Sequence, residues 1–146
     1  MKPAKRASGW HSEAVFWTPR NDADLTAGWR LWLELSTQNW PDANWNDTPA
    51  SAVWRLRELF AICDEIESEY VEESHEKSGE IVQLLRSLCF AASAPVELWW
   101  DDMNPLDSER AAMLHADLAC FADHAEGVRT ILAIGGGWSA LNSSVL

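Results

Sequence analysis

Two apolar seams constrain the fold of this chain more than any other feature of its sequence. In the first, apolar side chains recur at alternating spacings of four and three, at Ala52, Leu56, Leu59, Cys63, Ile66 and Tyr70. The second has the same spacing and comprises Leu114, Leu118, Phe121, Ala125, Val128 and Leu132. Such a repeat places every apolar side chain on one stripe of an α-helix, which packs almost antiparallel against a neighbouring helix. We therefore expect two long helices that share one core.

Helix caps and helix breakers delimit two further helices. Asn21–Asp24 is rich in residues that cap helix N-termini, so a helix should begin there and end at about Gln38. Another should run over 80–93 and end before Pro95, because proline lacks the backbone N–H that a helix interior needs. Residues 96–102 are expected to add a short helical turn that carries two tryptophans.

The two long seams have their own start and stop signals. Asp47-Thr48-Pro49 predicts that the first long helix begins at 49, and its apolar pattern extends to about 76. Asp107 and Ser108 predict the start of the second. Gly135–Gly137 predicts its end, as a helix cap and not as an anion-binding loop, because the glycines follow the helix instead of preceding it.

These elements describe an all-α, single-domain bundle of four main helices plus a short helical turn. The chain has 146 residues, of which 47% are hydrophobic, and this suits one domain with a buried core. No strand-like alternation of useful length occurs. We divide the chain into an irregular N-terminal arm (1–20), the helical bundle (21–137) and a C-terminal tail (138–146).

The charge balance and the hydropathy pattern narrow the function classes. The net charge is −12, and only the first 20 residues lean basic, so direct binding of DNA or RNA is not expected. The basic start, Met1–Arg6, is not followed by an apolar segment, and no run of about 18 apolar residues occurs. We therefore expect neither secretion nor a membrane span, and place the protein in the cytoplasm.

Acidic residues are concentrated in the second half of the first long helix. Nine acids lie between Glu58 and Glu80, with one lysine among them. The acids that share one broad helical face are Glu65, Glu69, Glu72, Glu73 and Glu76. Each like-charged pair at this spacing costs about 0.2–0.5 kcal/mol. One interpretation is a solvated face that aids solubility; the other, a recognition surface for a basic partner, explains why the repulsion is tolerated.

Tryptophan is unusually abundant, with ten residues in the chain. Core packing is expected for Trp29, Trp32 and Trp54. Loop or arm positions are expected for Trp10, Trp17, Trp40 and Trp45. Because tryptophan is enriched at binding hot spots, we select Trp40 and Trp45 as apolar anchors beside the acidic face.

The leading hypothesis is a non-enzymatic binding or regulatory protein that docks this acidic, Trp-flanked face on a basic partner protein. Inhibitors, immunity proteins, nucleic-acid mimics and small assembly subunits bind in this way. A homodimeric bundle whose exposed tryptophans meet across a two-fold axis is a further alternative. No cofactor is expected. No metal site is expected either, because Glu72-x-x-His75 is a single copy of a unit that di-iron bundles use twice.

An enzymatic alternative rests on one spacing. Arg110 is followed by His115 after four intervening residues, at the start of the last long helix. This pattern resembles the motif of all-helical ribonucleases of the HEPN type. The resemblance implies a metal-independent ribonuclease, in which Arg110 binds phosphate and His115 acts on the 2′-hydroxyl as acid or base. Arg6 and His11 show the same spacing outside any expected helix, and Ala111 stands where that family usually has a polar residue.

Overall fold

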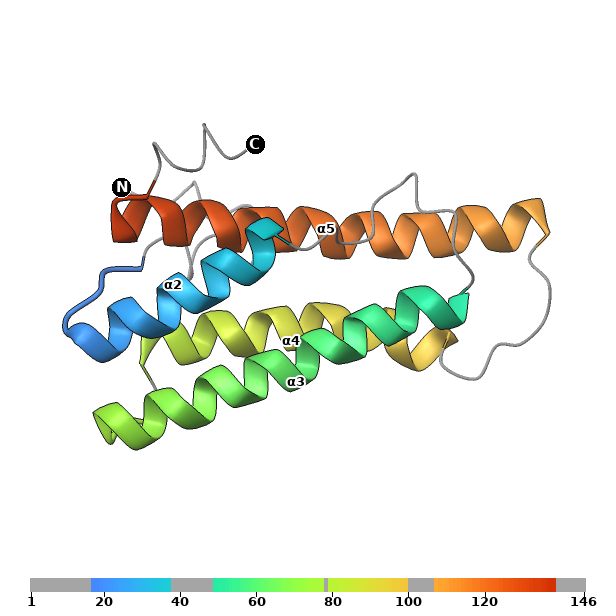
Figure 1. Cartoon of the computed structure of the whole chain (residues 1–146). Helices are drawn as coiled ribbons and strands as arrows, with labels where there is room; N and C mark the ends of the chain where they lie inside the picture. The colour runs from blue at the N-terminus through green and yellow to red at the C-terminus, as the bar shows by residue number, and fades with distance from the viewer. Residues whose placement is uncertain (1–16, 38–48, 78, 100–106, 139–146) are drawn as a thin grey trace, which may run out of the picture.

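A computed structural model describes residues 17–37, 49–77, 79–99 and 107–138 (Figure 1). The helices in chain order are α2 (Asp22–Thr37), α3 (Pro49–Ser74), α4 (Glu80–Trp99) and α5 (Ser108–Gly136). Strands do not occur in these ranges. The predicted all-α bundle of four main helices is confirmed.

The four helices pack in a ring in which each contacts the next along the chain, and α5 closes on α2. Figure 1 shows α5 running the length of the molecule, with α2 beside its C-terminal half. The helix α2 covers only half of α5 because it is shorter: α2 has 16 residues and α5 has 29. Both long seams face the centre of the ring, and every residue in them is at most 5% exposed.

The helix ends carry the caps that the sequence predicts. Asn21 accepts a hydrogen bond from the Asp24 backbone N–H on its side-chain oxygen, over 2.9 Å. Asp107 accepts one from the Arg110 backbone N–H over 2.8 Å. At the other end of α5, Gly137 adopts the left-handed conformation, with φ 78°. These contacts satisfy backbone groups that a helix terminus leaves unpaired.

The helix that we expected to end before Pro95 instead continues to Trp99, so this predicted boundary was wrong. Pro95 lies buried inside α4 and forfeits a backbone hydrogen bond there. At the end of the extension, Trp99 is 4% exposed, and its indole Nε1 donates a hydrogen bond to Asp117 of α5 over 3.0 Å. Burial of this indole, together with its hydrogen bond, offsets the bond lost at Pro95.

Four tryptophans gather where the C-terminal end of α5 meets α2. Trp29 and Trp32 of α2 stack with ring centroids 5.1 Å apart, and Trp138 packs edge-on against Trp29 at 5.0 Å. Trp17 lies 6.0 Å from Trp138 and is buried. The cluster therefore ties Trp17, upstream of α2, and Trp138, downstream of α5, to the bundle; we had assigned them to the arm and the tail.

One aromatic side chain that we expected in the core lies on the surface instead, and a second aromatic side chain is exposed on α4. Trp54 of α3 is 59% exposed and Phe90 of α4 is 81% exposed. The buried side chains of α4 include Leu88 and Ala92. Phe90 is two positions from each, which turns it about 200° around the helix, so it points away from the core.

Candidate functional site

The five acids predicted to bind a partner all lie on α3 or directly after it. Their side chains are exposed to solvent. Trp40 and Trp45, the predicted apolar anchors, lie outside the described residues, as does Trp10. The site that can be described is therefore the acidic face of α3 and the part of α2 that packs beside it.

Cations from another part of the chain reach this face. Arg30 of α2 lies between Glu65, at 3.8 Å, and Glu69, with which it forms a close ion pair. Arg20, which precedes α2, approaches Glu76 at 3.5 Å. The sequence analysis found few cations near these acids because it considered only their own helix, whereas Arg30 and Glu69 are 39 positions apart.

The acidic face keeps an excess of negative charge after this pairing. A further ion pair joins Glu67 to Arg86 of α4 at 2.9 Å. Nine acids lie in residues 58–80. Set against the one lysine there and these three arginines, they leave a net charge of −5. Glu72 and Glu73 are exposed and form no ion pair with any of the described residues.

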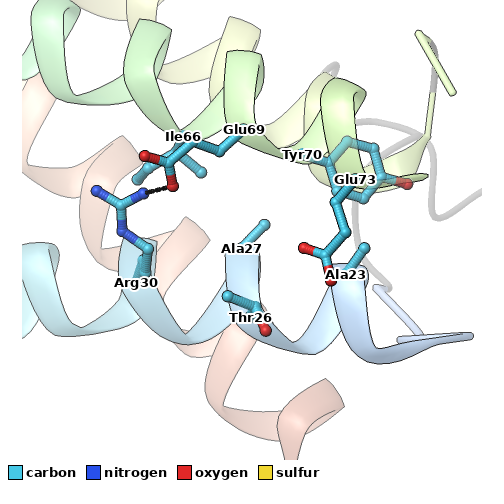
Figure 2. A pocket seen from close by; sticks show the side chains of 8 residues that line it. All are labelled: Ala23, Thr26, Ala27, Arg30, Ile66, Glu69, Tyr70 and Glu73. Atoms are coloured by element: carbon cyan, nitrogen blue, oxygen red, sulfur yellow. Dashed lines mark hydrogen bonds and ion pairs between the residues drawn. The ribbon is translucent and has the colours of Figure 1, made fainter. Parts of the chain in front are cut away.

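A small notch opens on this face between α2 and α3 (Figure 2). Its α2 wall is formed by the short side chains of Ala23, Thr26 and Ala27. Figure 2 shows Glu69 and Glu73 reaching across from α3, with Glu69 joined to Arg30 and Glu73 directed toward Ala23. The notch has a volume of about 20 Å³, which is the space of one water molecule or one ammonium group.

Tyr70 lines this notch and lies next to Asp24, a buried residue that we did not single out from the sequence. Asp24 is 4% exposed, and its carboxylate accepts a hydrogen bond from the Arg20 backbone N–H over 2.8 Å. Burial, followed by the neighbouring Asp24 carboxylate, raises the pKa of Tyr70. The sequence did contain a signal for the role of Asp24. An acid three residues after Asn21 resembles a capping box, in which both side chains accept backbone hydrogen bonds at a helix start.

The residues of the enzymatic alternative lie in the first turns of α5. The Arg110 guanidinium carbon is 5.6 Å from the centroid of the Trp99 ring, a cation–π arrangement. His115 is half-buried. A separation of five positions turns two side chains about 140° apart around a helix, so α5 by itself does not direct this pair at one substrate atom.

The Glu72–His75 pair stands at the end of α3, where His75 adopts a left-handed backbone conformation with φ 63°. Within the described ranges, no group of three or more His, Cys, Asp or Glu side chains is arranged to hold a metal ion.

Comparison with known proteins gives no relative from which a role could be transferred. No protein-family model, no curated protein and no solved structure matches the chain.

Proposed function

We propose that this protein is a non-enzymatic binding protein that docks the acidic face of α3 on a basic partner protein. The observation that carries this proposal is the net charge of −5 that residues 58–80, the segment bearing this face, keep after pairing with three arginines. A face that served only for solubility would not need carboxylates at the rim of a notch. Glu69 and Glu73 reach over the α2–α3 seam from one side of such a notch.

The size of the notch defines the group that would bind there. It has room for a single ammonium group, which could donate hydrogen bonds to Glu73 and to Glu69. Because both carboxylates are exposed, each such contact would contribute about 1 kcal/mol or less. A lysine of the partner would compete with Arg30 for Glu69, whereas Glu72 and Glu73 are already available.

Electrostatic attraction of this kind mainly accelerates association and selects the partner. Binding should therefore weaken as salt concentration rises, because exposed charges are screened. Inhibitors, immunity proteins, nucleic-acid mimics and small assembly subunits are the classes that use such a face. The partners of such proteins that themselves bind nucleic acid carry the most concentrated positive charge.

The test is affinity purification of the tagged protein from its native host, with mass spectrometry of the proteins that co-elute. The test variant combines Glu69→Gln, Glu72→Gln and Glu73→Gln. A matched control combines Gln83→Lys, Ala112→Lys and Thr130→Lys, which changes the net charge equally at exposed positions of α4 and α5.

We expect a basic protein that co-elutes with the wild type and the control and is lost from the test variant. Equal retention by both variants, or equal loss from both, would contradict the proposal, because only the location of the charge differs between them. The helical circular dichroism signal should be the same in all three proteins.

A further inference from the structure

The outer side of α4 carries exposed apolar side chains that have no part in the proposed binding by the acidic face of α3. Phe90 is 81% exposed and Leu98 is 67% exposed. Ala94 lies between them and is also exposed. Burying an apolar side chain of this size in an interface is favourable, because it removes apolar surface from water. A contiguous exposed apolar stripe is therefore a typical mark of an interaction surface.

Phe90 also borders a groove between α4 and α5. The groove has a volume of about 420 Å³, which falls in the range of sites that bind organic groups. It is lined by Ser87, Phe90, Ala91, Cys120, Phe121, Asp123 and His124. The Ser87 Oγ and the His124 Nε2 form a hydrogen bond over 3.1 Å. The groove therefore has room for an aromatic ring beside a polar pair that already has its hydrogen bond.

The charges on this face have a polarity along α4. The ten residues between Arg86 and Glu97 include no charged side chain, although the whole chain has a net charge of −12. Arg86 and Glu97 are both exposed, and they lie on nearly the same side of the helix, because eleven positions correspond to about three turns. The apolar stripe thus has a positive end and a negative end.

We propose that a second copy of this chain covers the α4–α5 face in a two-fold symmetric dimer. An interface of this symmetry must be complementary to itself, so each chain needs both the projecting group and the recess. Phe90 is the projecting group and the α4–α5 groove is the recess. Antiparallel contact of the two α4 helices places Arg86 of each chain opposite Glu97 of the other, with Phe90 between them. Arg86 also pairs with Glu67 of its own chain at 2.9 Å, so in the dimer it would lie between two carboxylates.

The charge distribution favours a second copy over a foreign basic partner. A basic partner would gain nothing from the uncharged centre of α4, whereas two acidic chains repel each other least where their charges are fewest. The dimer leaves both α3 acidic faces outside the contact between the α4 helices. This inference goes beyond the proposed function, and either can be correct without the other.

A lipid bilayer is the competing occupant of the stripe. By length and composition alone, α4 is the one helix of the described residues that could cross a membrane. However, the opposite side of α4 lies in the bundle core, where Ile81, Leu84 and Leu88 are buried. The helix could not enter a bilayer without opening that core, so we assign the stripe to protein contact.

The first test is sedimentation velocity of the full chain over a wide concentration range. We expect a monomer–dimer equilibrium in the wild type. Phe90→Glu should raise the dissociation constant about 30-fold or more, as the loss of a binding hot spot does. Ile134→Glu is the matched control, because Ile134 of α5 is 67% exposed and lies outside the groove. It should leave the equilibrium unchanged.

The second test uses charge reversal to establish the antiparallel arrangement. Arg86→Glu and Glu97→Arg should each weaken the dimer, and the double variant should restore it. Circular dichroism and thermal melting show whether each variant is folded. If Arg86→Glu is unfolded, Phe90→Glu still tests the proposal. A wild type that is monomeric at all concentrations would overturn the proposal, as would equal effects of Phe90→Glu and Ile134→Glu. So would a monomer that binds phosphatidylglycerol vesicles through Phe90, which would assign the stripe to lipid.

Discussion

Gly135 of α5 lies directly against Trp17, so closely that a β-carbon at this glycine would overlap the Trp17 carbonyl oxygen. Gly28 of α2 receives the Trp17 indole ring in the same way. One tryptophan is thus held between two helices at positions that only glycine can occupy. The neighbouring Gly136 lies against the Trp138 ring, and Gly137 adopts the left-handed conformation that ends α5. The three consecutive glycines therefore meet three different structural requirements.

Gly135→Ala should destabilise the protein by about 1–3 kcal/mol, because the added methyl group must displace the Trp17 backbone. The intrinsic helical preference of alanine offsets this by about 0.5–1 kcal/mol. Gly137→Asn is the control, since asparagine tolerates the left-handed conformation and nothing lies near that position. Urea denaturation followed by circular dichroism measures both. If Gly135→Ala is no less stable than Gly137→Asn, the close contact with Trp17 is wrong.

Asp117→Ala should cost about 1–3 kcal/mol of stability, because it leaves the indole N–H of buried Trp99 without an acceptor. The same variant should reduce the helical signal slightly if the last turn of α4 unwinds. Asp123→Ala, an exposed position on the same helix, provides the comparison and should have little effect on stability. Equal stability of the two variants would show that the Trp99–Asp117 hydrogen bond does not hold the end of α4.

Alkaline pH should destabilise the protein through Tyr70, the one tyrosine in the sequence. Burial and the Asp24 carboxylate raise the pKa of Tyr70 in the folded state above the value of the unfolded chain. The resulting stabilisation is fully present below about pH 10 and is lost as pH rises through the folded pKa. Between about pH 9 and pH 11, the unfolding free energy of Tyr70→Phe should therefore fall less than that of the wild type.

The tyrosinate absorbance gives an independent check of this prediction, because no second tyrosine contributes. Its midpoint in the native protein should lie above its midpoint in urea. A native midpoint at or below the unfolded one would contradict the burial of the Tyr70 hydroxyl beside Asp24.

The three cysteines should react with Ellman's reagent in a fixed order. Cys120 is exposed, Cys89 is half-buried and Cys63 is buried, and all three are free thiols. A hydrogen bond with Cys89, followed by burial, raises the pKa of Cys63, so its reactive thiolate is disfavoured. We expect Cys120 to react first, Cys89 slowly, and Cys63 only on unfolding. Cys120→Ser should remove the fast phase; a fast phase that persists would place another thiol at the surface.

Arg30→Gln should strengthen binding of a basic ligand while changing stability little. The Arg30 pairs with Glu65 and Glu69 are exposed, and such pairs contribute about 1 kcal/mol or less. Removing the arginine frees Glu69 for an incoming cation. Titration with an oligolysine peptide at low salt measures the effect, and Arg110→Gln on α5 controls for net charge. Weaker or unchanged binding by Arg30→Gln would contradict competition at the notch.

Much of the helical structure could be predicted from the sequence because it depends on local patterns. The caps at Asn21, Asp107 and Gly137 involve residues within about one turn of one another, and each seam repeats at spacings of three and four residues. The predicted helix end before Pro95 was wrong because of a contact between helices. The helix extends past the proline and buries Trp99 against Asp117 of α5. The error at Trp54 arose because apolar character alone does not tell which side of a helix faces the core.

The binding role of the candidate site stays a prediction. The five acids that the sequence placed on one helical face are exposed on α3 or directly after it. The sequence did not reveal that Arg30 and Arg20 reach that face, because side chains far apart in the sequence become neighbours only when α2 packs on α3. The α4–α5 groove was missed for the same reason, since its walls come from two helices.

By itself, the sequence determined the class of fold, the number of main helices, most of their ends and the excess of negative charge. Periodicity and capping depend on residues close together in the sequence. They predict the same helices however those helices pack against one another. The tertiary structure decided which helices are neighbours, and therefore which acids are paired, which tryptophans cluster and which apolar side chains remain on the surface. Those outcomes depend on the rotation of each helix about its own axis, and only the packing of the whole core fixes that rotation.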